Sequence, residues 1–355
     1  MRGRRSLSVL ACRVSRRRLL GAGLATLGIA NLVGRPTFAQ DVRYFQIGTG
    51  ETGGSLFVLG GVIAAVVSDP PGSRTCDEGG SCGVPGLIAT AETTAGSVEN
   101  VRSVAAGQLD SGLSQGDVAY WAFTGRDIFA HGGPVTSLRA IANLYQESVH
   151  VVVRRESGLT QVGDLKGKRV GLGPKDSGNL VTARFVLRAY GLTEKKLHPD
   201  YNDLGSTAAK LEQGKLDAFI AVGATPLPPV ADLAQRVPLA LLPITGNKIA
   251  DLRRDYSFLS VDIIPADTYQ GVPQNSTVGI GVIWLVADSL DEALVFQLTA
   301  ALWNKANRAL LDESGSLGRQ VLPGSALQAV PIPIHPGAQR FYAQMEQPPA
   351  TDTPP

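Results

Sequence analysis

The chain has 355 residues, more than the roughly 250–300 at which one hydrophobic core stops growing, so we expect two domains. Its composition is 44% hydrophobic, 18% charged and 6% aromatic, which excludes disordered, collagen-like and disulfide-dense proteins. The formal charge is +2, but eight of the 33 basic residues are arginines in the first 39 residues, where Asp and Glu are absent. Without these eight, 25 basic and 31 acidic residues remain, a net charge of −6 that excludes nucleic acids and anionic membranes as main partners.

The N-terminal segment 1–39 has the pattern of an export signal. The twin arginines Arg16 and Arg17 precede an uncharged run of 16 residues rich in Gly and Ala, and Thr37-Phe38-Ala39 resembles a cleavage site. The run is shorter than the roughly 20 residues that span a bilayer, so it predicts a twin-arginine-type signal peptide rather than an anchor. We therefore expect an exported, soluble, periplasmic protein.

The first segments of the body alternate between strand and helix patterns. Short apolar runs bounded by Gly or Pro predict strands, and longer apolar runs predict buried helices. The expected elements are a strand at 44–50, a helix at 55–69, a strand at 87–93, a helix at 98–107, a strand at 111–115 and a helix at 116–123. Asp117 is the expected N-cap of the last helix.

A second set of elements follows after two strand-like runs at 139–145 and 149–156. It comprises a strand within 164–173, the loop 173–178, a helix at 179–191 and a further strand within 211–226. This alternation predicts an α/β fold with mostly parallel sheets flanked by helices.

A short sequence occurs twice, 107 residues apart. Gly107-Gln108-Leu109-Asp110 and Gly214-Lys215-Leu216-Asp217 each end a helix and begin a strand. Such helix ends are common, so the match alone only weakly favours two similar lobes.

The body contains two cysteines, Cys76 and Cys82, in a glycine-rich loop. An even pair in an exported protein predicts a local disulfide. Two thiols provide only half of a zinc shell, no His lies near them, and the four histidines show no metal-ligand spacing. We expect no metal site.

The segment Gly48–Gly53 is a G-x-G-x-x-G motif between a strand and a helix, the context of a dinucleotide-binding turn. The acidic residue expected about 20 positions later on a second strand is missing, since Asp69 ends the helix itself. Any helix N-terminus with free N–H groups can hold an anion, and Gly96-Ser97 and Asp176-Ser177-Gly178 offer two more. Three such starts favour a small anion held between lobes, although each is also an ordinary helix cap.

Motifs of hydrolytic or redox catalysis are missing: the sequence has no G-x-S-x-G, H-E-x-x-H, Walker A or C-x-x-C segment. Binding without chemistry is the more economical hypothesis, so we expect no enzyme and no cofactor. An NAD-dependent oxidoreductase that uses the GTGETG turn is the competing hypothesis.

Four segments carry a family resemblance. They are IGTGETGGSLFVLGGVIA, TTAGSVENVRSVAAGQLDSGLSQGDVAYWAFTG, LRAIANLYQESVHVVVRRESGL and DLKGKRVGLGPKDSGNLVTARFVLRAYGLT. In this order they resemble the TAXI-type solute receptors of TRAP transporters, from about Tyr44 to Asn307. The resemblance implies a two-lobed periplasmic binding protein of type II-like fold with its ligand in the interlobe cleft. It also implies a small carboxylate ligand such as glutamate, glutamine or a 2-oxoglutarate-like dicarboxylate, and delivery by hinge closure to TRAP membrane permease subunits.

The resemblance also implies a set of ligand-binding residues. They are Thr49, Gly50, Thr52, Gly53, Ser97, Asn100, Gln115, Ser177, Gly178 and Asn179. Asn179 replaces the family's Thr, and Leu56 and Phe57 stand where Tyr is usual.

The usual crossing pattern of such receptors places lobe 1 at 41–146 and 289–347, and lobe 2 at 147–288. The Pro-rich end 348–355 is expected to be a disordered tail. We expect a monomer, and a receptor for an ABC importer or a sensor kinase is an alternative to the TRAP partner.

Overall fold

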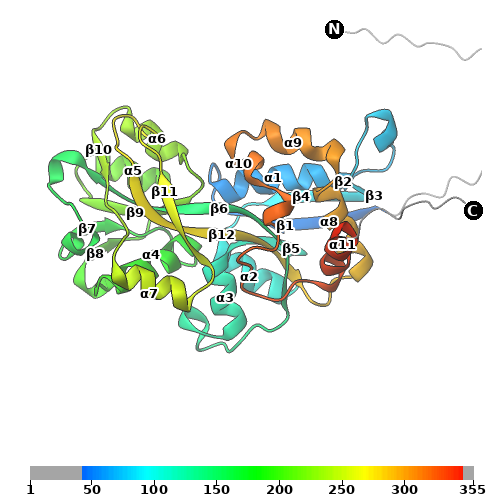
Figure 1. Cartoon of the computed structure of the whole chain (residues 1–355), viewed down its shortest axis with the longest axis horizontal. Helices are drawn as coiled ribbons and strands as arrows, with labels where there is room; N and C mark the ends of the chain where they lie inside the picture. Colours follow the sequence, from blue (N-terminus) through cyan, green and yellow to red (C-terminus); the bar gives the residue numbers. More distant parts are fainter. Residues whose placement is uncertain (1–41, 347–355) are drawn as a thin grey trace, which may run out of the picture. The chain divides into compact units, whose positions relative to one another are not determined.

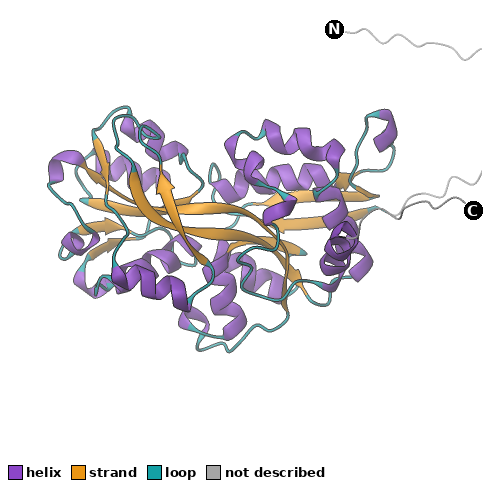
Figure 2. Ribbon diagram, viewed as in Figure 1, coloured by secondary structure: helices purple, strands orange, loops and turns teal. Residues whose placement is uncertain are grey.

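The computed structural model describes residues 42–346, which belong to one compact unit. Within this range ten strands form one sheet, and helices cover both of its faces (Figure 1 and Figure 2). The predicted signal peptide 1–39 and the predicted tail 348–355 lie outside the described residues. No helix in the range 42–346 has both the length and the apolar character that crossing a membrane requires.

The strands and helices alternate through most of the chain. The strands are β1 (Arg43–Gly48), β2 (Ser68–Asp69), β3 (Val84–Pro85), β4 (Leu87–Glu92), β5 (Ser111–Gln115), β6 (Leu138–Arg154), β7 (Arg169–Gly171), β8 (His198–Asp200), β9 (Ala218–Gly223), β10 (Leu239–Leu241), β11 (Leu259–Ile264) and β12 (Asn275–Ala287). The helices are α1 (Ser55–Val67), α2 (Ser97–Ala105), α3 (Gly116–Thr124), α4 (Gly178–Ala189), α5 (Leu204–Glu212), α6 (Pro228–Ala234), α7 (Asn247–Asp255), α8 (Glu292–Leu302), α9 (Arg308–Glu313), α10 (Ser316–Gln320) and α11 (Pro336–Glu346).

The sheet uses one strand order twice. The order β4-β1-β5-β12-β6 forms one end, and the order β8-β7-β9-β6-β10 forms the other. We call the end that contains β1 the first lobe and the end that contains β7 the second lobe. The predicted α/β class and two-lobed fold are confirmed. The lobe boundaries stay a prediction, because β6 and β12 belong to both ends.

The repeated Gly-x-Leu-Asp sequence occupies equivalent places in the two lobes. Gly107 and Gly214 have φ angles of 68° and 70°, in the left-handed region that favours glycine. The Asp110 carboxylate then accepts the Gln46 N–H of β1 at 2.8 Å, and the Asp217 carboxylate accepts the Arg169 N–H of β7 at 2.8 Å. This aspartate therefore ties the start of β5 to β1 in the first lobe and the start of β9 to β7 in the second lobe.

Two long strands connect the lobes. β6 has 17 residues and β12 has 13, and both run through the middle of the molecule (Figure 1). The two strand-like runs at 139–145 and 149–156 are thus one strand. The sheet is mixed rather than mostly parallel: β1 pairs in parallel with β4 and β5, whereas β12 is antiparallel to β5 and β6, and β6 to β9. A strand that leaves the first lobe must run against the strands of the second, because both sets of parallel strands end at the junction.

The hydrophobic core is continuous on one face of the sheet and divided on the other. On the first face, α2 and α3 share one buried cluster with α4 of the second lobe. Trp121 of α3 lies 6.1 Å from Phe185 of α4 and 5.9 Å from Phe258, measured between ring centroids. On the second face one cluster lies under α1 and α8, and another under α5 and α6. The two lobes therefore share a continuous core on only one face of the sheet.

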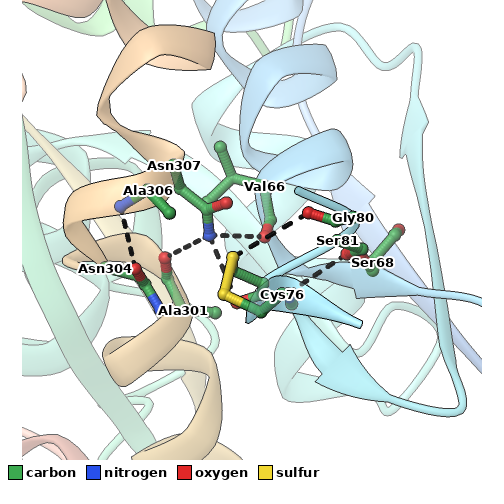
Figure 3. The surroundings of a disulfide bond; sticks show 11 residues. Val66, Ser68, Cys76, Gly80, Ser81, Ala301, Asn304, Ala306 and Asn307 are labelled. Carbon is green, nitrogen blue, oxygen red and sulfur yellow. Dashed lines mark hydrogen bonds between the residues drawn. A yellow bond between two sulfur atoms is a disulfide. The ribbon is translucent and has the colours of Figure 1, made fainter. Parts of the chain in front are cut away.

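The predicted disulfide between Cys76 and Cys82 is confirmed, with 4.7 Å between the two Cα atoms. It closes the loop between β2 and β3, next to the end of α1 (Figure 3). The Asn307 side chain lies beside the loop and donates hydrogen bonds from Nδ2 to the carbonyl oxygens of Ala301 (2.9 Å), Val66 (3.2 Å) and Cys82 (3.3 Å). One buried amide thus fixes the base of the loop to α1 and α8.

Candidate ligand-binding site

A cavity of about 520 Å³ lies between the lobes, at the C-terminal ends of β5 and β9. Small organic ligands occupy cavities of this size, and the ends of parallel strands are a common place for them. The lining comprises residues 50–56, 95–97, 173–174, 177–179, 202–205 and 227–229 with Gln115, Glu147, Thr207, Ile220, Val222 and Asp232.

The glycine turn places the N-terminus of α1 at this cavity. Gly53 has a φ angle of 84°, and the N-cap residue Gly54 has no side chain to cap the helix. Gly96, the N-cap of α2, likewise provides no side-chain cap. The predicted residues Gly50, Thr52 and Gly53 line the cavity. Two helix N-termini therefore face the cavity with N–H groups that no capping side chain accepts.

Ser97, Gln115 and Glu147 form a buried polar network in the cavity wall, each at most 3% exposed. Ser97 Oγ accepts the Gln115 N–H at 3.0 Å and donates to Gln115 Oε1 at 3.3 Å. Gln115 Nε2 donates to Glu147 Oε2 at 2.8 Å. Glu147, which the sequence did not predict as a site residue, therefore holds the Gln115 side chain, and Gln115 in turn bonds Ser97.

Glu147 was expected only as a lobe boundary, yet it is the most buried carboxylate of the cavity. Its Oε1 accepts the hydroxyl groups of Ser55 at 2.7 Å and Tyr145 at 2.8 Å. Burial raises the pKa of Glu147, and the hydrogen bonds from Ser55, Gln115 and Tyr145 partly oppose that rise. The signal in the sequence was that Glu147 is the one acidic residue of the long strand β6.

Thr49 and Asn100, both predicted ligand-binding residues, do not line the cavity, because their polar groups bind the protein itself. Both are 0% exposed. Thr49 Oγ1 donates to the Glu92 carbonyl at 2.7 Å. Asn100 Nδ2 donates to the carbonyls of Thr49 (2.6 Å) and Leu113 (2.7 Å), and its Oδ1 accepts the Thr94 hydroxyl at 2.8 Å. Asn100 thus ties β1 to β5 and positions the glycine turn.

In the second lobe the predicted residues Ser177, Gly178 and Asn179 line the cavity at the start of α4. Ser177 caps its own helix through its hydroxyl. Asn179 Nδ2 donates to the carbonyls of Leu172 (2.8 Å) and Ile220 (2.9 Å), and its Oδ1 accepts the Val222 N–H at 2.7 Å. The amide of Asn179 therefore joins α4 to β9 and is already engaged.

Gly178 allows the two lobes to approach. A Cβ atom at this position would lie 1.7 Å from Gln115 Oε1 and 2.6 Å from Ser97 Oγ of the first lobe. Arg102 in α2 and Asp176, before α4, form an ion pair across the same junction at 2.7 Å. Any larger residue at position 178 would push the polar network of the first lobe apart.

The cavity is acidic. The lining contains no Lys, Arg or His. It contains four carboxyl groups, those of Glu51, Glu147, Asp203 and Asp232. Burial raises the pKa of Glu51, the Leu204 N–H opposes this, and the charge of Asp203 adds to it. Hydrogen bonds from Ser206 lower the pKa of Asp203. The ion pairs found in residues 42–346 involve none of the four.

Asp117 is not the cap of α3 that its position predicted. It lies at the second residue of the helix and is 0% exposed. Its Oδ1 accepts the Val118 N–H at 2.8 Å, and its Oδ2 accepts the Thr182 hydroxyl at 2.7 Å from α4 of the second lobe. Burial raises the pKa of Asp117 to about 7. Its role is a contact between lobes.

Comparison with known proteins adds a family to this geometry. The model of the family described as the NMT1-like family matches residues 47–345. The chain belongs to the NMT1-like family. The resemblance to TAXI-type receptors of TRAP transporters, which the sequence suggested, stays a prediction. Among residues 42–346 of this NMT1-like chain, no group of three His, Cys, Asp or Glu side chains is placed to hold a metal ion.

Solved structures similar to this NMT1-like chain have low sequence identity to it. The periplasmic aliphatic sulphonate binding protein SsuA from Escherichia coli is 16% identical, with a TM-score of 0.44 over 85% of this chain and 87% of that one. SsuA from Xanthomonas axonopodis pv. citri, bound to MOPS, is 18% identical, with a TM-score of 0.46 over 88% and 86%. PhnD1 from Prochlorococcus marinus, in complex with methylphosphonate, is 14% identical, with a TM-score of 0.48 over 81% and 92%.

Proposed function

We propose that the protein is a solute receptor that encloses a small polar molecule between its lobes and delivers it to a membrane transporter. The observation that carries this proposal is the cavity itself. Both lobes build it, and they meet at the contact of Gly178 with the Gln115 side chain. A ligand that touches both walls favours the conformation in which the lobes are together.

This proposal includes the expectation that the protein binds its solute and does not catalyse a reaction. The polar groups of Ser97, Gln115 and Asn179 are engaged in hydrogen bonds that hold the cavity wall. The competing oxidoreductase would place a pyrophosphate at the glycine turn, next to Glu51, where repulsion between negative charges opposes it.

The transporter partner is proposed as one of two classes. The sequence resemblance favours TRAP permease subunits. Two solved proteins similar to this chain are named as binding proteins of sulfonate and amino acid ABC transporters. Purification of the tagged receptor from membranes that contain either transporter, followed by an uptake assay, separates the two.

Export to the periplasm through the twin-arginine route belongs to the same proposal. It rests on Arg16 and Arg17 and on the uncharged run that follows them. Replacement of both arginines by Lys should leave the protein in the cytoplasmic fraction. Unchanged recovery from the periplasm contradicts this route.

A thermal-shift screen of small solutes tests the receptor function. A solute present at 100 times its dissociation constant should stabilise the folded chain by about 2.7 kcal/mol. The panel includes the predicted carboxylates glutamate, glutamine and 2-oxoglutarate, together with amines, sulfonates, phosphonates and NADH. A shift with NADH alone favours the oxidoreductase, and no shift with any solute contradicts the receptor.

A further inference from the structure

No basic side chain of the described residues lines the cavity to balance its four carboxyl groups. Basic residues are common in the chain, but none of the described ones lines the cavity. Lys175 and Arg102 are close in sequence to residues that line the cavity. Arg102 is paired with Asp176, and Lys175 Nζ lies 5.7 Å from the centre of the Tyr201 ring. The charged side chains that line the cavity are therefore all negative.

Glu147 is the most deeply buried carboxylate of the cavity, and no positively charged side chain within residues 42–346 is paired with it. It is 1% exposed, and its three hydrogen-bond donors, Ser55, Tyr145 and Gln115, are all neutral. Oε1 accepts two of these hydrogen bonds and Oε2 only one, although each carboxylate oxygen can accept two. Buried carboxylates in proteins are normally paired with a positive charge.

We propose that the solute carries a positively charged ammonium or guanidinium group, which binds against Glu147. This inference rests on the proposed receptor function and specifies its ligand class. A cation would take the remaining acceptor position of Oε2 and offset the charge of the other three carboxyl groups. Amines and basic amino acids therefore fit the cavity, and dicarboxylates, sulfonates and phosphonates do not.

A carboxylate is compatible with the site only on a molecule that also carries the cation. The uncapped N-termini of α1, at Gly54, and α2, at Gly96, are places where such a carboxylate can bind. The small carboxylate expected from the sequence is thereby narrowed to an amino-carboxylate. A dicarboxylate without an amine would bring two negative charges to four others.

Calorimetric titration of the full chain at pH 7.5 with matched probes tests the charge of the ligand. Butane-1,4-diamine, 4-aminobutanoate and butanedioate share one chain length and differ in charge. L-lysine, L-glutamine and L-glutamate form a second series, and methylphosphonate is a third type of anion. Within each series we expect the most positive member to bind at least tenfold more tightly than the most negative one.

The outcomes separate the inference from the receptor function. If an anion binds as tightly as its cationic counterpart, the inference is wrong and the receptor function stands. If no probe and no other small solute binds, the receptor function is contradicted and the inference falls with it.

Substitutions locate the cation. Glu147→Gln preserves the shape of the side chain and removes its charge, and it should weaken binding of the tightest amine at least tenfold. Glu313→Gln, at an exposed position of α9 outside the cavity, is the matched control and should bind as the parent does. If Glu147→Gln fails to fold, Glu51→Gln takes its place, with an expected loss of at least threefold. Parent-like binding by the folded cavity variant overturns the assignment to these carboxylates.

Discussion

The Thr182 hydroxyl of the second lobe donates a 2.7 Å hydrogen bond to the Asp117 carboxylate of the first lobe, in an environment closed to solvent. The bond joins α3 to α4 on the face where the core is continuous. The cavity lies where the two lobes meet without a shared core. The lobes therefore share a core on the α3–α4 face, whereas α1 of the first lobe and α5 and α6 of the second lobe line the cavity from separate clusters.

Asp117 should make the stability of the protein depend on pH. Its pKa is raised to about 7 in the folded chain, above the ordinary value of 3.8. The folded state therefore binds the proton more tightly, so this contribution to stability is complete below about pH 4 and is lost as the pH rises through 7. Asp117→Asn should remove on the order of 4 kcal/mol of that pH dependence.

Urea denaturation of the parent and of Asp117→Asn between pH 4 and 8 measures this difference. Comparison of the two chains is needed because His150, whose pKa burial lowers to about 4, acts in the opposite direction. A difference that stays constant over the whole pH range contradicts the expected titration of Asp117.

Asn100→Ala should destabilise the fold rather than remove a direct ligand contact. The substitution leaves the buried carbonyls of Thr49 and Leu113 without their donor, which costs about 2–3 kcal/mol of unfolding free energy. Asn247→Ala, at an exposed position of α7, should change stability by less than about 0.5 kcal/mol. Parent-like stability of Asn100→Ala with lost solute binding would restore the direct contact that the sequence suggested.

Removal of the disulfide should have a modest and local effect. Replacement of Cys76 and Cys82 by Ser frees a short exposed loop and should lower the unfolding free energy by about 2 kcal/mol. Solute affinity should stay within twofold of the parent, because neither cysteine lines the cavity. Urea denaturation and calorimetry check the two parts, and a large loss of affinity would show that the loop acts on the site.

Binding of an amine should weaken as the pH falls. Burial raises the pKa of Glu147, and an adjacent cation lowers it again, so protonation of Glu147 competes with the cation. The affinity for butane-1,4-diamine should decrease as the pH falls through the raised pKa, and Glu147→Gln should abolish this decrease. Tyr145 and Asp117 also interact with Glu147, so Asp117→Asn is the control, and it should keep the decrease. Equal affinity of the parent from pH 4 to 8 contradicts this role of Glu147.

The sequence predicted the elements of the first half of the fold because their signals are local. The glycine turn, the strand 111–115 and the helix after Gly178 all follow from turn residues and apolar runs. It did not predict that β6 is one strand shared by both lobes, because two strand-like runs separated by Gln-Glu-Ser look like two elements. That sharing depends on pairing with β12, more than 120 residues later.

The candidate site was predictable to the extent that glycine turns mark helix starts. Eight of the ten expected residues line the cavity, and two do not. Asn100 stood at such a helix start, but its amide points into the first lobe, which spacing along the chain does not reveal. The sequence did not predict Glu147 as a site residue, because its partners Ser55 and Gln115 are distant in sequence and only the fold brings them to it.

The most direct test of the central claim compares solute binding by the parent, Gly178→Ala and Gly163→Ala in one calorimetric experiment with the tightest solute of the screen. An added methyl group at Gly178 would meet the Gln115 side chain at 1.7 Å, whereas at Gly163 it has nothing within 4 Å. Enclosure of the solute between the lobes predicts one site per chain, parent-like affinity for Gly163→Ala, and at least a tenfold loss for Gly178→Ala. Equal affinity of all three chains would contradict it.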